Sequence, residues 1–228
     1  MSEIQSFKVV LVGESGVGKT SIITQFIDQT FQEDQQSTTG GTFSTKSVVC
    51  DNGKTLKFEI WDTAGQERYR SLTKMFYKDA NAAVLVFDIT RKDSFEELQN
   101  YWAQQIKESS PPDIILAVAA NKSDLIDNEA VDEEKSRAFA NELGAIYVST
   151  TATTVESINE LFIEIAKKYT NATDIKIKGD DEVQEQHEDK IDYVKLSKVK
   201  RRKKREDFVN IINLLSIILD IFLLSLIN

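Results

Sequence analysis

A glycine-rich segment near the start of the chain, Gly13 to Thr20, constrains the fold more than any other stretch. Its sequence is GESGVGKT, and it lies between a short apolar run at residues 7–12 and residues 21–27, whose apolar spacing suits a helix. The order strand, glycine-rich loop and helix is the context in which the pattern G-x-x-x-x-G-K-[ST] binds phosphate groups. Glycines let the backbone wrap with its N–H groups inward, and the helix N-terminus adds a partial positive charge. We therefore predict a nucleotide phosphate site, with a glycine-rich turn that binds nothing as the alternative.

Two residues of this loop have specific expected roles. Lys19 can reach the β- and γ-phosphates of a nucleotide, and the hydroxyl group of Thr20 can hold Mg²⁺. The residues at this loop that are expected to contact the nucleotide are Gly13, Ser15, Gly16, Val17, Gly18, Lys19, Thr20 and Ser21.

The negative charge of the chain lies in its first three quarters. Residues 1–170 contain 17 Lys and Arg against 26 Asp and Glu, a net charge of −9, whereas residues 171–228 contain 11 of each. An acidic folded part argues against a nucleic-acid-binding surface, so no nucleic acid is expected as a partner. The single cysteine, Cys50, excludes an intramolecular disulfide, which fits the cytosol.

Apolar runs and turn signals predict alternating strands and helices. Two extended runs, residues 42–51 and 55–62, flank an Asn-Gly pair, which is a strong hairpin signal. Continuous apolar runs predict buried strands at residues 82–88, 114–120 and 145–148. Helical segments are expected at residues 93–107, 132–143 and 155–169. We therefore predict an α/β fold with a six-stranded, mostly parallel sheet, one antiparallel edge strand, helices on both faces and ligands at the carboxyl ends of the strands.

A second motif, Asp62-Thr63-Ala64-Gly65-Gln66, ends the second hairpin strand. A carboxylate there can face the phosphate loop and help to hold Mg²⁺, directly or through water. Gly65 lets a backbone N–H approach a γ-phosphate closely, because glycine has no Cβ. Gln66 can orient an attacking water. The alternative interpretation is an ordinary strand end followed by a turn.

A third motif, Asn121-Lys122-Ser123-Asp124, follows the apolar run at residues 114–120. The carboxylate of Asp124 can accept two hydrogen bonds from the N1–H and the exocyclic amine of guanine, which adenine cannot offer. Asn121 can tether neighbouring loops and the base, and the stem of Lys122 can pack over the ring. The motif therefore predicts a guanine nucleotide.

These three motifs stand in the order found in one family. Over residues 6–169 the chain resembles a small GTPase of the Ras superfamily, which implies the P-loop NTPase (small G protein) fold. The sequences IWDTAGQERY at residues 60–69 and FDIT at residues 87–90 resemble the Rab family in particular. The residues most similar to its early-endosomal branch are those at 31–33, 37–38, 40, 43 and 69–72.

The resemblance implies further site residues. Thr38 matches the switch I threonine that closes onto Mg²⁺ and the γ-phosphate, and Phe31 matches the aromatic residue that packs against guanine. Thr151 and Ala152 match the segment whose backbone contacts the guanine oxygen. The implied catalytic residues are Gln66, Lys19 and Thr38, and the implied metal ligands are Thr20, Thr38 and Asp62.

An aromatic triad is also implied. Phe43, Trp61 and Phe76 match three residues that family members present to effector proteins, and they bracket both switch segments. Ordinary packing on the sheet surface is the alternative.

The function implied by the resemblance is that of a molecular switch in vesicle trafficking. Such a protein has a monomeric G domain, binds GTP or GDP with Mg²⁺, and recruits effectors to the cytoplasmic face of endomembranes, here endosomal, in the GTP state. No arginine in the chain is an obvious arginine finger, the residue that stabilises charge in the transition state. We therefore expect slow hydrolysis that a GTPase-activating protein accelerates. An exchange factor is also expected as a partner. A GTP-binding scaffold with negligible hydrolysis or exchange is the alternative. An ATPase or nucleotide kinase is disfavoured by Asp124.

The chain departs from the family pattern at three places. Thr39 replaces a usual apolar residue after the switch threonine, which puts the choice of effector in doubt. Thr153 replaces the lysine of a Ser-Ala-Lys motif, so weaker base affinity or faster exchange is expected. Cysteines that receive prenyl groups usually end Rab proteins, but Cys50 lies within a predicted strand, so this chain has no prenylatable C-terminal cysteine.

The tail differs in composition from the rest. We predict a GTP-binding domain at residues 1–170, a disordered hypervariable linker at 171–207 that ends in a basic run, and an apolar C-terminal segment at 208–228. That segment is long enough to span a bilayer. A polar stripe that includes Asp220 also suits an interfacial helix beside anionic lipid, and a mistranslated or intron-derived end is the third interpretation. Each predicts membrane association for the natural protein.

Overall fold

The computed structural model of the chain describes residues 4–33, 38, 41–63 and 76–177. The chain divides into two units, Met1–Ile191 and Asp192–Asn228, and every described residue belongs to the first. The apolar segment predicted at 208–228 and most of the predicted linker lie outside the described residues. Within the described ranges, none of the helices has the length and apolar character needed to cross a membrane.

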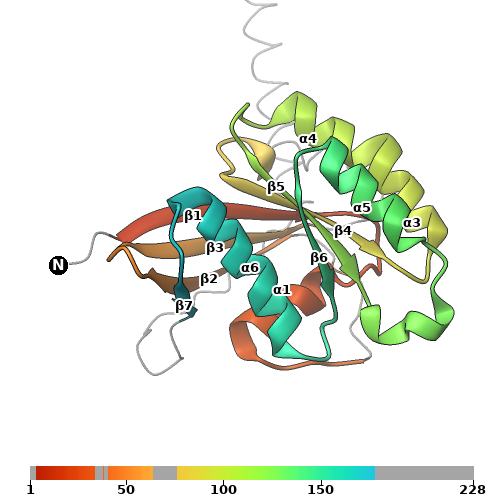
Figure 1. The fold of residues 1–228 in the computed structure, drawn as a ribbon, viewed down its shortest axis with the longest axis horizontal. Coiled ribbons are helices and arrows are strands. Elements are labelled where there is room, and N and C mark those ends of the chain that lie inside the picture. Colours follow the sequence, from red (N-terminus) through yellow and green to blue (C-terminus); the bar gives the residue numbers. More distant parts are fainter. Residues whose placement is uncertain (1–3, 34–37, 39–40, 64–75, 178–228) are drawn as a thin grey trace, which may run out of the picture. The chain divides into compact units, whose positions relative to one another are not determined.

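The described chain forms a mixed α/β domain (Figure 1). Its strands are β1 (Ile4–Val12), β2 (Gly41–Cys50), β3 (Thr55–Thr63), β4 (Ala82–Asp88), β5 (Ile115–Asn121), β6 (Ile146–Thr150) and β7 (Ile175–Ile177). Its α-helices are α1 (Lys19–Asp28), α3 (Lys92–Glu97), α4 (Ala103–Ser109), α5 (Glu133–Glu142) and α6 (Val155–Thr170), with a π-helical turn η2 (Leu98–Trp102) and a 3₁₀ segment η3 (Ser123–Asn128).

One sheet runs through the domain in the order β6-β5-β4-β1-β3-β2-β7. The strands from β6 to β3 pair in parallel, whereas β2 pairs antiparallel with both β3 and β7. Parallel strands bring their carboxyl ends to one edge of the sheet, which is where α/β folds bind ligands. The ends of β1, β3 and β5 therefore place the three motifs at a common edge.

The predicted α/β fold with a mostly parallel sheet is confirmed, and the sheet contains seven strands instead of the predicted six. Ile175 pairs with Cys50 and Ile177 with Val48, within a segment predicted to be polar linker. The N–H group of Asp51 donates to the carbonyl of Asp174 (3.0 Å), and the carboxylate of Asp51 accepts the N–H of Asp174 (3.1 Å). Two isoleucines in a polar stretch are too short a pattern to predict a strand, and pairing with β2 supplies the stability.

Helices cover both faces of the sheet (Figure 1). On one face, α1 and α6 pack on alternate residues of the central strands, and the rings of Phe26 and Phe162 stack at 3.8 Å. On the other face lie α3, α4 and α5, where Phe95 contacts Phe87 of β4 (4.9 Å) and Phe139 of α5 (5.7 Å). All seven residues of β4 are buried, as expected for a strand covered on both sides.

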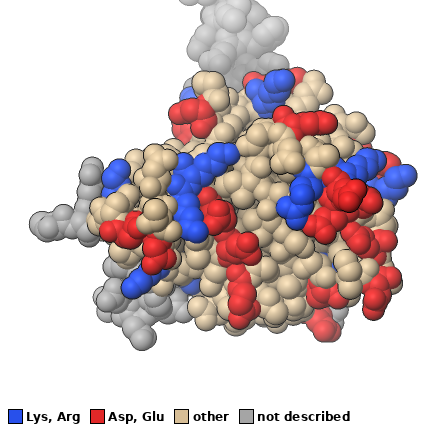
Figure 2. Space-filling model, viewed as in Figure 1, with Lys and Arg blue, Asp and Glu red and all other residues tan. Residues whose placement is uncertain are grey.

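The surface of the domain carries charges of both signs. Figure 2 shows Asp and Glu gathered over the region of α3 and α5. These helices have the sequences KDSFEE and EEKSRAFANE, with acidic residues in their first turns. Acidic side chains there stabilise the helix N-termini.

Candidate functional site

The glycine-rich loop connects β1 to α1 and has the backbone conformation that its sequence predicts. Gly13, Gly16 and Gly18 all have positive φ angles, of 144°, 78° and 95°. A Cβ atom at Gly18 would lie 2.3 Å from the Asn121 side-chain nitrogen, and one at Gly13 would lie 2.2 Å from the carbonyl oxygen of Val86. Only glycine therefore fits at these two positions, because both the dihedral angles and the space exclude a side chain.

A cavity of about 390 Å³ lies beside this loop at the carboxyl edge of the sheet. Its volume falls within the range of roughly 300–1,000 Å³ that is typical of small-molecule sites. The predicted nucleotide-binding residues that line it are Ser15, Gly16, Gly18, Lys19, Thr20, Ser21, Phe31, Thr38, Asn121, Lys122, Asp124, Thr151 and Ala152. The structure thus brings the phosphate loop, the segment after α1 and the loops after β5 and β6 around one cavity.

Some predicted residues do not line the cavity. Gly13 and Val17 belong to the loop but are not among its lining residues. Gly65 and Gln66 lie outside the described residues, so their roles stay predictions. Residues that line the cavity without having been predicted are Gln32, Glu33, Thr63 and Leu125; the position of Leu125, directly after the base motif, is a signal that could have identified it. Thr153, which the sequence marks only as a departure from the family pattern, also lines the cavity.

Lys19 lies at the first position of α1 and is 5% exposed. Its ammonium group donates to the carbonyl oxygens of Gly13 (2.9 Å) and Glu14 (2.8 Å). Burial lowers the pKa of Lys19 to about 8, and the negative charges of Asp62 and Glu14 partly oppose that shift. A buried cation at a helix N-terminus is suited to an anionic phosphate.

Three oxygen-bearing side chains meet at the end of β3. The hydroxyl of Thr20 donates to the carboxylate of Asp62 (2.6 Å), and the hydroxyl of Thr38 lies 2.6 Å from that of Thr20 and 3.4 Å from the carboxylate. Asp62 is 1% exposed, and burial raises its pKa. Its second oxygen, Oδ1, has no hydrogen-bond partner among the described residues. This donor set fits Mg²⁺, which takes oxygen ligands and is usually bound through one or two carboxylates plus substrate phosphates.

The third motif begins at the last residue of β5. Asn121 is 1% exposed; its side-chain nitrogen donates to the carbonyl of Val17 (2.8 Å), and its oxygen accepts the hydroxyl of Thr150 (3.1 Å). Asn121 therefore joins the phosphate loop to the ends of β5 and β6. The ammonium group of Lys122 lies 2.6 Å from the carboxylate of Asp88, at the end of β4.

Asp124, the residue predicted to read guanine, has its carboxylate oriented by a neighbouring loop. The hydroxyl of Thr151 donates to Asp124 Oδ1 (2.5 Å), and the hydroxyl of Thr153 lies 2.7 Å from that of Thr151. The N–H group of Thr153 also donates to the Thr151 oxygen (3.2 Å). The threonine that replaces the usual lysine thus supports the hydroxyl that holds Asp124.

The three aromatic residues predicted for the effector surface lie in a row. The ring of Trp61 on β3 lies 5.0 Å from that of Phe43 on β2 and 5.4 Å from that of Phe76. Phe43 and Trp61 are partly exposed, whereas Phe76 is 6% exposed and presents little surface. Their contact is consistent with both the predicted interface and its packing alternative, so the interface stays a prediction.

The fold and the site together define a class. A phosphate loop that opens a helix, a carboxylate with two hydroxyls beside it, and a base motif at the end of a nearby parallel strand are the parts of a P-loop nucleotide-binding protein. The model of the Ras family matches residues 8–171. The chain belongs to the Ras family and, as a member, is a small GTPase.

Proposed function

We propose that this GTPase is a Rab-like switch, which recruits effector proteins to a membrane in its GTP state and hydrolyses GTP slowly. The observation that carries the proposal is the position of Thr38, whose hydroxyl lies 2.6 Å from that of Thr20 beside Asp62. A residue from the loop after α1 thus meets the residues that would hold Mg²⁺. When bound, Mg²⁺ would neutralise charge on the β- and γ-phosphates.

Thr38 gives the switch its physical basis. Its hydroxyl contacts Thr20, which lines the cavity, and the buried carboxylate of Asp62 beside it. Addition or removal of a γ-phosphate changes the charge and the hydrogen-bond acceptors next to that hydroxyl. The loop that carries Thr38 leads into β2 and Phe43, so the nucleotide state is coupled to the surface proposed for effectors.

The Rab assignment and the trafficking role depend on sequence motifs. The segment IWDTAGQERY includes Trp61 and Asp62 at the end of β3, and FDIT includes Asp88 at the end of β4. Recognition of endosomal effectors and regulators through Phe43, Trp61 and Phe76 follows from that assignment.

Catalysis is tested by single-turnover hydrolysis of GTP. The parent chain is expected to hydrolyse slowly, and Gln66→Leu to be slower still, because Gln66 is proposed to orient the attacking water. A Gln66→Leu variant as fast as its parent contradicts that role. Nucleotide that is entirely GTP after long incubation of the parent chain supports the scaffold alternative instead.

The membrane role is tested on the full chain with vesicles. Binding to anionic vesicles is expected to exceed binding to neutral vesicles, because residues 195–205 carry eight Lys and Arg. Replacement of Arg201, Arg202 and Arg205 by Gln is the matched variant and is expected to weaken binding to anionic vesicles. Equal binding of the parent chain to both kinds of vesicle contradicts an electrostatic contribution.

A further inference from the structure

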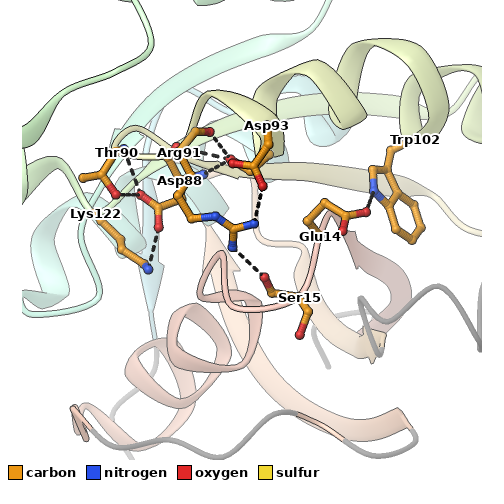
Figure 3. A network of polar contacts seen from close by, with 9 residues as sticks. Glu14, Ser15, Asp88, Thr90, Arg91, Asp93, Trp102 and Lys122 are labelled. Atoms are coloured by element: carbon orange, nitrogen blue, oxygen red, sulfur yellow. Dashed lines mark hydrogen bonds and ion pairs between the residues drawn. The ribbon is translucent and has the colours of Figure 1, made fainter.

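The turn between β4 and α3 contacts the phosphate loop from outside the cavity (Figure 3). Arg91 is the N-cap residue of α3. Its N–H group donates to the carbonyl of Asp88 (3.0 Å), and its own carbonyl accepts the N–H (3.1 Å) and the hydroxyl (2.7 Å) of Ser94. The backbone of Arg91 is therefore fixed on both sides, and its side chain extends from a rigid base.

The guanidinium group of Arg91 is held at two points. One nitrogen, Nη1, donates to the backbone carbonyl of Ser15 (3.0 Å), and the other, Nη2, forms an ion pair with Asp93 (2.6 Å). A Cβ atom built on Gly16 would lie 3.6 Å from Nη1, so the guanidinium packs against the peptide that joins Ser15 to Gly16. Because the guanidinium is a planar fork, its bond to Asp93 also sets the direction of its bond to Ser15.

The geometry of the peptide group determines the effect of this bond. In a planar trans peptide, the C=O and the following N–H point in opposite directions. Ser15 and Gly16 line the cavity, whereas Arg91 is not among its lining residues. With the Ser15 carbonyl held outward by Arg91, the N–H group of Gly16 is turned toward the cavity, where inward N–H groups bind phosphate oxygens.

A second side chain holds the neighbouring residue of the loop. The indole N–H of Trp102 donates to the carboxylate of Glu14 (3.2 Å), and Trp102 itself is fully buried. Figure 3 shows this contact and the Arg91–Ser15 contact on adjacent loop residues. The helical segment after β4 thus holds the loop at two consecutive positions.

We propose that Arg91 is a positioning residue for the phosphate site, which fixes the Ser15–Gly16 peptide so that the Gly16 N–H faces the nucleotide phosphates. This role rests on the proposed guanine-nucleotide function. Arg91 acts through the backbone of the loop and touches no nucleotide itself. Without the hydrogen bond from Arg91, the Ser15–Gly16 peptide can rotate and turn its carbonyl oxygen toward the phosphates. That oxygen would repel the phosphate oxygens, because both carry negative charge.

The first test compares Arg91→Ala with Lys92→Ala. Lys92→Ala is the matched control, because it removes the same charge from the adjacent residue. Among the described residues, Lys92 forms an exposed ion pair with Glu96 (3.5 Å). Arg91→Ala is expected to release a fluorescent GDP analogue about tenfold faster, as for a partly exposed charged hydrogen bond. Lys92→Ala is expected to release it at the parental rate.

The second measurement separates positioning from general destabilisation. The chain has nine glycines, so selective ¹⁵N-glycine labelling of the GDP complex gives a short set of amide signals that includes Gly16. Arg91→Ala is expected to move the Gly16 signal and the ³¹P signal of the GDP β-phosphate, whereas Lys92→Ala leaves both in place. Unmoved signals in Arg91→Ala, or equal shifts in both variants, overturn the proposal.

Arg91→Lys keeps the positive charge but not the fork that contacts Ser15 and Asp93 together. It is expected to move the Gly16 signal as Arg91→Ala does, and it carries the test if Arg91→Ala does not fold. If Arg91→Lys releases the GDP analogue at the parental rate and leaves the Gly16 signal in place while Arg91→Ala does not, charge alone matters. That result overturns the positioning role. A parent chain that binds no GDP contradicts the proposed function as well, whereas a parent that binds GDP and an Arg91→Ala variant that matches it contradict only the role of Arg91.

Discussion

The ammonium group of Lys122 lies 2.6 Å from the carboxylate of Asp88, which joins the loop after β5 to the end of β4. Asp88 is 1% exposed, and its other oxygen accepts the N–H (2.9 Å) and the hydroxyl (2.7 Å) of Thr90. One buried carboxylate thus contacts Lys122, in the loop after β5, through one oxygen, and Thr90, in the turn that precedes Arg91, through the other (Figure 3).

Asp88→Ala is expected to lower the free energy of unfolding by about 2 kcal/mol, because the ammonium of Lys122 and the donors of Thr90 lose their acceptor. Urea unfolding measures this change. Arg137→Ala is the control: it breaks an exposed ion pair with Glu133, also of 2.6 Å, and exposed pairs contribute less than about 1 kcal/mol. Equal losses in the two variants contradict the importance of Asp88.

Gly18→Ala is expected to weaken GDP binding at least about 100-fold, because its Cβ would collide with the Asn121 side chain at 2.3 Å and a strained φ adds about 1–2 kcal/mol. Gly144→Ala is the matched control. Gly144 also has a positive φ, of 63°, but nothing lies within 4 Å of its added Cβ. The control is expected to lose about 1 kcal/mol of stability with unchanged GDP affinity, as measured by titration calorimetry.

Thr20→Ala is expected to make GDP release nearly independent of Mg²⁺. The Thr20 hydroxyl contacts both Asp62 and Thr38 (2.6 Å each). Its removal eliminates one expected Mg²⁺ ligand and leaves the other two joined only by their own 3.4 Å contact. In the parent chain, chelation of Mg²⁺ should accelerate GDP release by about tenfold or more, since hard oxygen ligands and phosphates share the ion. A variant that responds to the chelator like its parent argues against Thr20 as a ligand.

Cys50 is expected to make stability fall at alkaline pH. Burial raises the pKa of its thiol, so above the ordinary thiol pKa of about 8.5 the unfolded chain loses a proton that the folded chain retains. Unfolding is then favoured as pH rises, by at most about 1.4 kcal/mol per pH unit. Urea unfolding of the parent and Cys50→Ala between pH 7.5 and 9.5 isolates the effect: the decline should be smaller in the variant, and parallel curves contradict it.

Much of the fold could be predicted because its strands are continuous apolar runs. The helix predicted at residues 132–143 is observed as α5 (Glu133–Glu142), and that at 155–169 as α6 (Val155–Thr170). The helix predicted at 93–107 is observed as α3, η2 and α4 in succession, over residues 92–109. Its π-helical turn could not be predicted, since periodicity does not distinguish one added residue per turn.

The site was predictable where a motif fixes both residue type and spacing. Thr20 and Asp62 are 42 residues apart, yet each belongs to a motif with one structural context, and the structure places their side chains in contact. The roles of Arg91 and Thr153 could not be predicted in this way. A single arginine after a strand and a threonine in place of lysine belong to no motif with a fixed spacing. Their contacts depend on tertiary structure alone.

The strand β7 fixes the place at which the chain leaves the described domain. Residues Ile175–Ile177 pair with β2 through three residue pairs. The strand β2 also carries Phe43 of the proposed effector surface. A three-residue edge strand therefore determines that the described chain ends next to β2, the strand that also carries the proposed effector surface.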